Sequence, residues 1–186
     1  MLGANILLLI TDTLLSVYTL MVLLRCVFML SHVDFYHPIV QAVVRMTERP
    51  LMLLRPIAPA VGRVDFAAWL LALAVKALHI VLIVLIQGGA PPAGLSLLAM
   101  ALIQVATIVI YIYIFAIIIL AVSSWFISGV QALSHPFISL INAVSAPLLI
   151  NIRRFLPSAG VIDFSPLIAL LLLYIALNIL KSLGWA

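Results

Sequence analysis

PAVGRVDFAA, at residues 59–68, decides the fold because it returns as PSAGVIDFSP at residues 157–166. The two copies share the pattern P-x-x-G-x-x-D-F, and the step from one aspartate to the next is 98 residues in a chain of 186. The shared positions are Pro59, Gly62, Asp65 and Phe66 in the first copy and Pro157, Gly160, Asp163 and Phe164 in the second. So long a period predicts a duplicated unit, because solenoid modules repeat about every 20–50 residues, at most about half of that step.

The composition around these motifs is that of a membrane protein. Hydrophobic residues make up 67% of the chain and charged residues 8%, with a mean hydropathy of +1.41. A soluble domain is about half apolar and a quarter charged. The net charge of +4 comes without any block of basic residues, so orientation in a bilayer explains it and no nucleic-acid partner is expected. Cys26 stands alone, which excludes a disulfide framework and a cysteine metal site.

Four apolar runs are long enough to cross about 30 Å of hydrocarbon as helices. They cover residues 4–30, 66–87, 95–127 and 164–183, and no basic segment of a signal peptide precedes the first. We therefore expect an all-α integral membrane protein with four transmembrane helices in two duplicated hairpins. The first repeat covers residues 1–94 and the second residues 95–186. Because each half holds two spans, both halves start on the same side, which makes the repeat parallel.

Basic residues predict how the spans lie in the bilayer. Arg45, Arg49, Arg55 and Arg63 lie between the first two spans, and Arg153 and Arg154 lie between the last two. The N-terminal tail and residues 87–96 carry no Lys or Arg. By the positive-inside rule both basic segments are cytoplasmic and both termini are periplasmic. Arg25, near the cytoplasmic end of the first span, is expected to snorkel to the interface as an anchor.

The two basic segments are amphipathic. In residues 37–59 the side chains of Gln41, Arg45, Glu48 and Arg49 share one helical face. Each segment begins with His-Pro, which suits the first turn of a helix, and Pro50 and Pro147 are expected to end the two helices.

We expect these two helices to lie on the cytoplasmic interface with their arginines beside anionic headgroups, and a re-entrant dip into the bundle is the alternative. Arg153 and Arg154 can grip an anionic lipid or an acidic partner, although interface solvation also explains them.

The repeated motif is expected to form the turn that leads back into the membrane. Proline ends the interfacial segment, Gly62 permits a positive φ, and Asp65 caps the first free N–H groups of the next helix. In the second copy Ser165-Pro166 offers a competing cap. The alternative is that Asp65 and Asp163 also face one another and bind a cation or a partner.

Four polar residues lie at membrane depth: Asp12, Lys76, His79 and Gln104. A charge near the middle of a span costs about 2.5–3.5 kcal/mol, so we expect a specific interaction or a functional role to offset the cost of Lys76. Asp12 lies at nearly the same depth, so a buried Asp12–Lys76 pair is one interpretation. A proton or cation relay along the four residues is a second, and an uncharged Lys76 is a third.

Nothing in the sequence predicts catalysis. The histidines outside the spans show no metal-ligand spacing, and no nucleophile, Walker, zinc-protease or dinucleotide motif occurs. We therefore expect neither an enzyme nor a bound cofactor or metal.

The sequence resembles the YggT family of small bacterial membrane proteins. The resemblance rests on the paired P-x-x-G-x-x-D-F turns, the R-R-F-L-P entry at residues 153–157, the D-F-S-P at residues 163–166 and the Ser124-Trp125 pair. The two-copy arrangement is that of the proteobacterial branch. The first copy departs from the pattern at Arg55-Pro56 and at residues 67–68, so the two halves contribute unequally to any shared surface.

The resemblance implies a bacterial inner-membrane protein linked to osmotic-stress tolerance and cation uptake, with plastid relatives tied to haem attachment in the cytochrome b–f complex. Two hypotheses follow. The first is a protein of ion homeostasis, either an oligomeric cation transporter or a modulator of one. The second is a non-enzymatic assembly or scaffold factor for a membrane complex. The expected partners are the lipid bilayer, anionic lipid, further copies of the chain or another membrane protein.

Overall fold

The protein is helical along almost all of the chain that the computed structural model describes, which is residues 2–62, 64–92, 94–126, 135–155 and 163–183. Its helices are α1 (Leu2–Leu30), α2 (Pro38–Leu54), α3 (Phe66–Ile86), α4 (Leu95–Phe126), α6 (Pro136–Phe155) and α7 (Ser165–Leu183). The long helices α1, α3, α4 and α7 are apolar around most of their surface, as expected of helices that lie in hydrocarbon.

Five of the described helices are long and apolar enough to cross a membrane. Four of them, α1, α3, α4 and α7, are the helices predicted from the apolar runs. The fifth is α6, which the sequence analysis placed on the interface or in a re-entrant dip. The protein is therefore a helical membrane protein.

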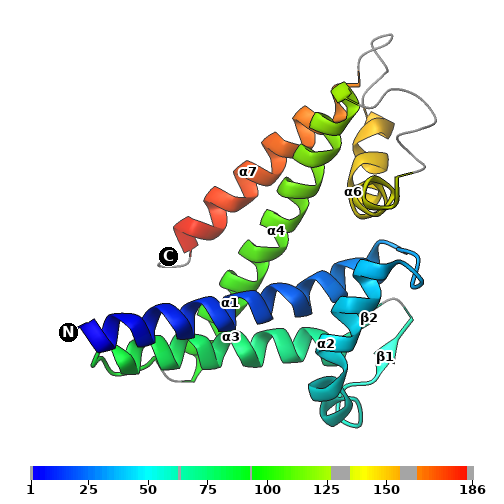
Figure 1. Cartoon of the computed structure of the whole chain (residues 1–186). Helices are drawn as coiled ribbons and strands as arrows, with labels where there is room; N and C mark the ends of the chain where they lie inside the picture. The colour runs from blue at the N-terminus through cyan, green and yellow to red at the C-terminus, as the bar shows by residue number, and fades with distance from the viewer. Residues whose placement is uncertain (1, 63, 93, 127–134, 156–162, 184–186) are drawn as a thin grey trace.

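The helices pack as two hairpins, α1 with α3 and α4 with α7 (Figure 1). Helix α2 lies against α1 and α3, and α6 lies against α4 and α7 in the same way. The hairpins meet where α4 contacts α3 and α1. The start of α1 and the end of α7 lie toward one side of the molecule, whereas α2, the short β-strands and α6 lie toward the other (Figure 1).

The main core lies where the second half of α1 meets α2 and α3. Val22, Leu23 and Val27 of α1 are fully buried there, together with Leu51 of α2 and Ala72 of α3. The small side chains at one face of α3, among them Ala67, Ala68 and Ala72, let the helices approach closely. This core holds α2 against the end of the first hairpin.

The first copy of the repeated motif forms a tight β-hairpin. Strand β1 (Ala60–Val61) pairs antiparallel with β2 (Val64–Asp65). Gly62 has a φ of +60°, which a two-residue hairpin turn requires. Asp65 is the N-cap of α3, where its side chain accepts a hydrogen bond of 3.2 Å from the Ala68 N–H. The predicted roles of Gly62 and Asp65 are confirmed.

The second copy is described only from Asp163 onward, so Pro157 and Gly160 lie outside the described residues. The Asp163 carboxylate accepts a hydrogen bond of 2.9 Å from the Ser165 N–H. Ser165 is the first residue of α7, so it lies inside the helix and cannot be its N-cap. The Asp163 side chain accepts from the N-terminal N–H of the helix in its place. The competing Ser165-Pro166 cap is not formed.

The two helices that start with His-Pro, α2 and α6, begin as predicted but do not end as predicted. His37 caps α2 through a 3.2 Å hydrogen bond from the Ile39 N–H, with proline at the first helical position. Pro50 and Pro147, however, lie inside α2 and α6. The buried residues of α2 show why, since Val40, Val43, Thr47 and Leu51 form one stripe that runs past Pro50. Packing on both sides of the proline outweighs its cost of about 3 kcal/mol.

Candidate functional site

Three polar side chains form a hydrogen-bonded chain inside the first hairpin. The His79 Nε2 atom lies 3.0 Å from Asp12 Oδ1, and His79 Nδ1 lies 3.1 Å from Lys76 Nζ. Lys76 and His79 are one helical turn apart on α3 and both are buried, whereas Asp12 comes from α1. When Lys76 is an ammonium group, which only donates, Nδ1 of His79 accepts from it and Nε2 carries the proton that is donated to Asp12.

This chain lines a cavity of about 290 Å³. The cavity wall consists of Asp12, Lys76, His79, Ile80, Ile83, Val84 and Gln104. It therefore lies among α1, α3 and α4. At about 30 Å³ per water molecule it has room for several waters, and its polar groups offer them partners. All four polar residues that the sequence predicted at membrane depth meet at this cavity.

The order of the three groups differs from the predicted buried Asp12–Lys76 pair. His79 lies between the two charges, and 61% of the Asp12 side chain is exposed. The pair interpretation is therefore wrong, because the His79 imidazole separates Lys76 from Asp12 and hydrogen-bonds to both. The chain runs from a buried cation to a half-open carboxylate.

A second polar cluster surrounds Arg25 near the other end of α1. Its Nη1 atom lies 2.8 Å from Glu48 Oε2 and donates a 3.1 Å hydrogen bond to Thr47 Oγ1. Its Nε atom lies 3.8 Å from Asp65 Oδ2. Glu48 also pairs with Arg55 at 2.8 Å. Arg25 thus ties α1 to α2 and to the capping residue of α3.

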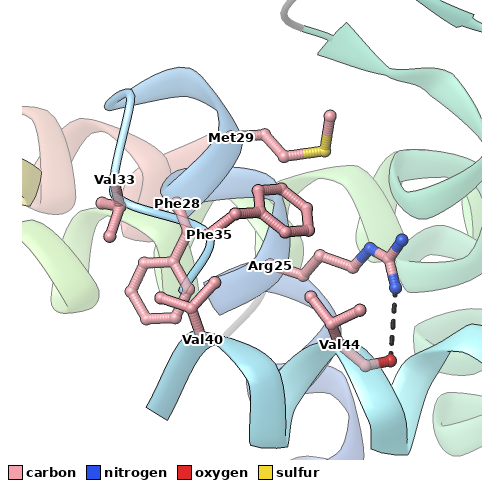
Figure 2. A pocket seen from close by; sticks show the side chains of 7 residues that line it. All are labelled: Arg25, Phe28, Met29, Val33, Phe35, Val40 and Val44. Atoms are coloured by element: carbon pink, nitrogen blue, oxygen red, sulfur yellow. Dashed lines mark hydrogen bonds between the residues drawn. The ribbon is translucent and has the colours of Figure 1, made fainter. Parts of the chain in front are cut away.

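Figure 2 shows the surroundings of the Arg25 side chain and its longer hydrogen bond, 3.4 Å, to the Val44 carbonyl oxygen. Phe28, Phe35 and Val40 line the small space beside it, which at about 10 Å³ has room for a single water molecule at most. Arg25 is only 4% exposed, so the prediction that it snorkels to the interface is wrong. Helix α2 covers this end of α1, and its Glu48 takes the place of headgroups and water.

In the second half of the chain, a different arginine pairs with the aspartate of the repeated motif. Arg153 of α6 holds the Asp163 carboxylate through Nε at 3.0 Å and Nη2 at 2.7 Å. Partial burial of Asp163 opposes ionisation, but hydrogen bonds from Ser165 and Arg153 outweigh it and lower the pKa of the carboxyl group. Asp65 and Asp163 therefore each lie beside an arginine of their own half of the chain, Arg25 and Arg153 respectively.

Sequence reasoning missed Thr47 and Glu48 as partners of Arg25. Glu48 was assigned to the polar face of α2 with Arg45 and Arg49, and it is the sole acidic residue in residues 37–59. A single carboxylate among several arginines indicates an ion pair, and this was the signal in the sequence that could have identified Glu48. Among the described residues, no group of three His, Cys, Asp or Glu side chains is placed to hold a metal ion.

Comparisons with known proteins agree with the duplicated motif. The family model described as CCB3/YggT matches residues 4–86 and 99–184. An uncharacterized protein YggT of Escherichia coli is 34% identical over 171 residues, which is 92% of this chain and 87% of that protein. An uncharacterized protein of Pseudomonas aeruginosa is 36% identical over 165 residues, 88% of this chain and 82% of its own length. No solved structure matches the chain.

Proposed function

The chain belongs to the CCB3/YggT family, and from that premise we propose that it is a multi-pass protein of the bacterial inner membrane that supports ion homeostasis. It acts as a transporter, assembled from several copies, or as a modulator of one. The observation that carries this proposal is the cavity where Asp12, His79 and Lys76 form one hydrogen-bonded chain. Lys76 lies halfway along α3, about 15 Å from either end at 1.5 Å per residue.

The energetic argument is that such a cluster is expensive to keep in hydrocarbon. Each charge at this depth costs about 2.5–3.5 kcal/mol, and apolar side chains would pack the three helices without that cost. Charges within spans line ion and proton pathways in other membrane proteins. A cavity beside them with room for several water molecules supports the same role here.

We further propose a topology of four spans, with α2 and α6 at the cytoplasmic interface and both termini in the periplasm. The two matches of the family model and the like packing of α2 and α6 on their hairpins support a parallel repeat. Arg153 and Arg154 in the last turn of α6 support an interfacial position for that helix. In this proposal the protein is not an enzyme and needs no cofactor.

The test is ion flux into liposomes that contain the purified full-length protein. Imposed gradients of K⁺, Na⁺ or pH should give saturable flux, and Lys76→Met should abolish it while circular dichroism shows an intact fold. Lys181→Met is the matched control, because it removes an exposed lysine at the end of α7. Flux equal to that of protein-free liposomes, for every ion and at several protein densities, would rule out an autonomous transporter.

A scaffold function is the second candidate, and it is favoured by the surface where α1 passes into α2. Phe35 and Tyr36 are exposed there and share a hollow of about 390 Å³ with Gln41 and Arg45. An aromatic and cationic surface of this kind suits an acidic protein partner or a headgroup layer. Tyr36→Ala or Arg45→Gln should then impair function in cells while Lys76→Met leaves it intact, which is the reverse of the first hypothesis.

A further inference from the structure

We propose that the ion handled at the cavity is the proton, and that His79 passes it between Lys76 and Asp12. This inference rests on the proposed function and names its substrate. It is carried by the order of the three groups, with the imidazole hydrogen-bonded to both neighbours through different ring nitrogens. A group bonded in this way can accept a proton on one side and release one on the other.

The lining of the cavity disfavours a dehydrated metal cation. Cations such as Ca²⁺ or K⁺ are held by rings of about six to eight oxygen ligands. Here the side-chain oxygens come from Asp12 and Gln104 alone, and the Lys76 ammonium lies in the same wall. Ile80, Ile83 and Val84 supply the rest of the wall and offer no side-chain ligand.

The transfer balances without any co-reactant. At the start Lys76 is an ammonium, His79 is neutral with its proton on Nε2, and Asp12 is a carboxylate. The Lys76 N–H bond breaks as Nδ1–H forms, and the Nε2–H bond breaks as an O–H bond forms on Asp12. At the end all three groups are neutral. The net charge is zero before and after, so the step creates no new charge inside the membrane.

The exposure of the groups shows where the proton can leave the chain. Lys76 and His79 are buried, whereas most of the Asp12 side chain is open. Asp12 can therefore release its proton to cavity water, and Lys76, which lines the same cavity, takes up another from that water. His79 regains its first tautomer when its Nδ1–H bond breaks, releasing a proton to cavity water, and an Nε2–H bond forms with a proton from that water. Each cycle passes one proton from Lys76 through His79 to Asp12, and the same bonds allow the reverse transfer.

The groups that face His79 are few. Asp12 comes from α1 and Lys76 from its own helix, while the α4 side of the cavity contributes Gln104. The Gln104 amide does not gain or lose protons at physiological pH, so it takes no part in the proton transfer. It can only hydrogen-bond to water in the cavity. Among the described residues of the cavity wall, the titratable groups are thus the three members of the chain.

The experiment measures proton flux with a pH-sensitive dye trapped in liposomes that contain the full-length protein, under a K⁺ diffusion potential. His79→Gln keeps an amide donor and acceptor at this position but cannot exchange protons through a ring. We expect it to reduce the dye response to that of protein-free liposomes, and Asp12→Asn to do the same. His135→Gln is the matched control, since His135 is exposed beside α6, and it should behave as the unmodified protein.

The outcomes separate this inference from the function on which it rests. K⁺ or Na⁺ flux without a dye response would overturn the proton as substrate and leave a role in ion transport standing. A dye response unchanged in folded His79→Gln would overturn the relay. Absence of flux for any ion would overturn both proposals. If His79→Gln fails to fold, Asp12→Asn decides the matter, because the exposed Asp12 carboxylate contributes less to packing.

Discussion

Replacing Arg25 with alanine tests whether the buried charge cluster holds the first half of the protein together. The change removes a charge-assisted hydrogen bond to Glu48, worth about 1.5–3 kcal/mol, and a second bond from the same cation to the Thr47 hydroxyl, worth about 1.5 kcal/mol. It also leaves the buried Asp65 carboxylate without the cation 3.8 Å away. Glu48 keeps Arg55 as a partner, so it is not left alone. The sum is a loss of about 3–5 kcal/mol, the usual range for breaking a buried pair.

The assay is reversible unfolding in mixed micelles with increasing SDS, followed by far-UV circular dichroism. Arg49→Ala is the matched control, because Arg49 is exposed on the same helix as Glu48, and it should change the unfolding free energy by less than about 0.5 kcal/mol. Arg25→Lys keeps the charge but not the forked donors, so it should recover only part of the loss.

A double-mutant cycle of Arg25→Ala with Glu48→Ala isolates the pair between α1 and α2. We expect a coupling energy of about 1.5–3 kcal/mol, because the two groups lie 2.8 Å apart and the guanidinium is buried. A change of less than about 1 kcal/mol in Arg25→Ala would refute the reasoning, and so would a coupling energy near zero. Either result would mean that the Arg25 cluster does not hold α1 against α2.

Three further predictions concern the repeated turns. Asp65→Ala should lower the unfolding free energy by about 2 kcal/mol or more, because it removes the cap of α3 and a counter-charge of Arg25. Asp163→Ala should lower it by less than about 1 kcal/mol, because that carboxylate is half exposed. SDS unfolding of the two variants measures both values. Gly62→Ala should cost about 1 kcal/mol in the same assay from its positive φ alone, since no atom lies within 4 Å of the added methyl group, and an unchanged stability would contradict the turn. The folded pKa of Asp163 lies below its unfolded value, so its ionised form stabilises the protein above about pH 4 and the contribution is lost as pH falls through the folded pKa. In Arg153→Gln the NMR titration of the Asp163 carboxyl should move to higher pH, and an unmoved titration would contradict the pair.

The sequence determined the features that depend on neighbours along the chain. The lengths of the apolar runs set the long helices, because helical rise and bilayer thickness are fixed quantities. The hairpin turn at Gly62 and the cap at Asp65 could be predicted for the same reason, since both depend on residues within a few positions. The spacing of Lys76 and His79 already placed two polar groups on one face of α3.

The tertiary structure decided which polar groups meet. Asp12 and His79 are 67 residues apart, and Arg25 and Thr47 are 22 apart, so each contact depends on how two helices are rotated against one another. Periodicity gives the face of a helix but not the partner that covers it. That is why Lys76 was matched with the wrong group and Arg25 was placed at the interface. The same limit explains Pro50, because packing across a whole helix overrode a local signal to stop it.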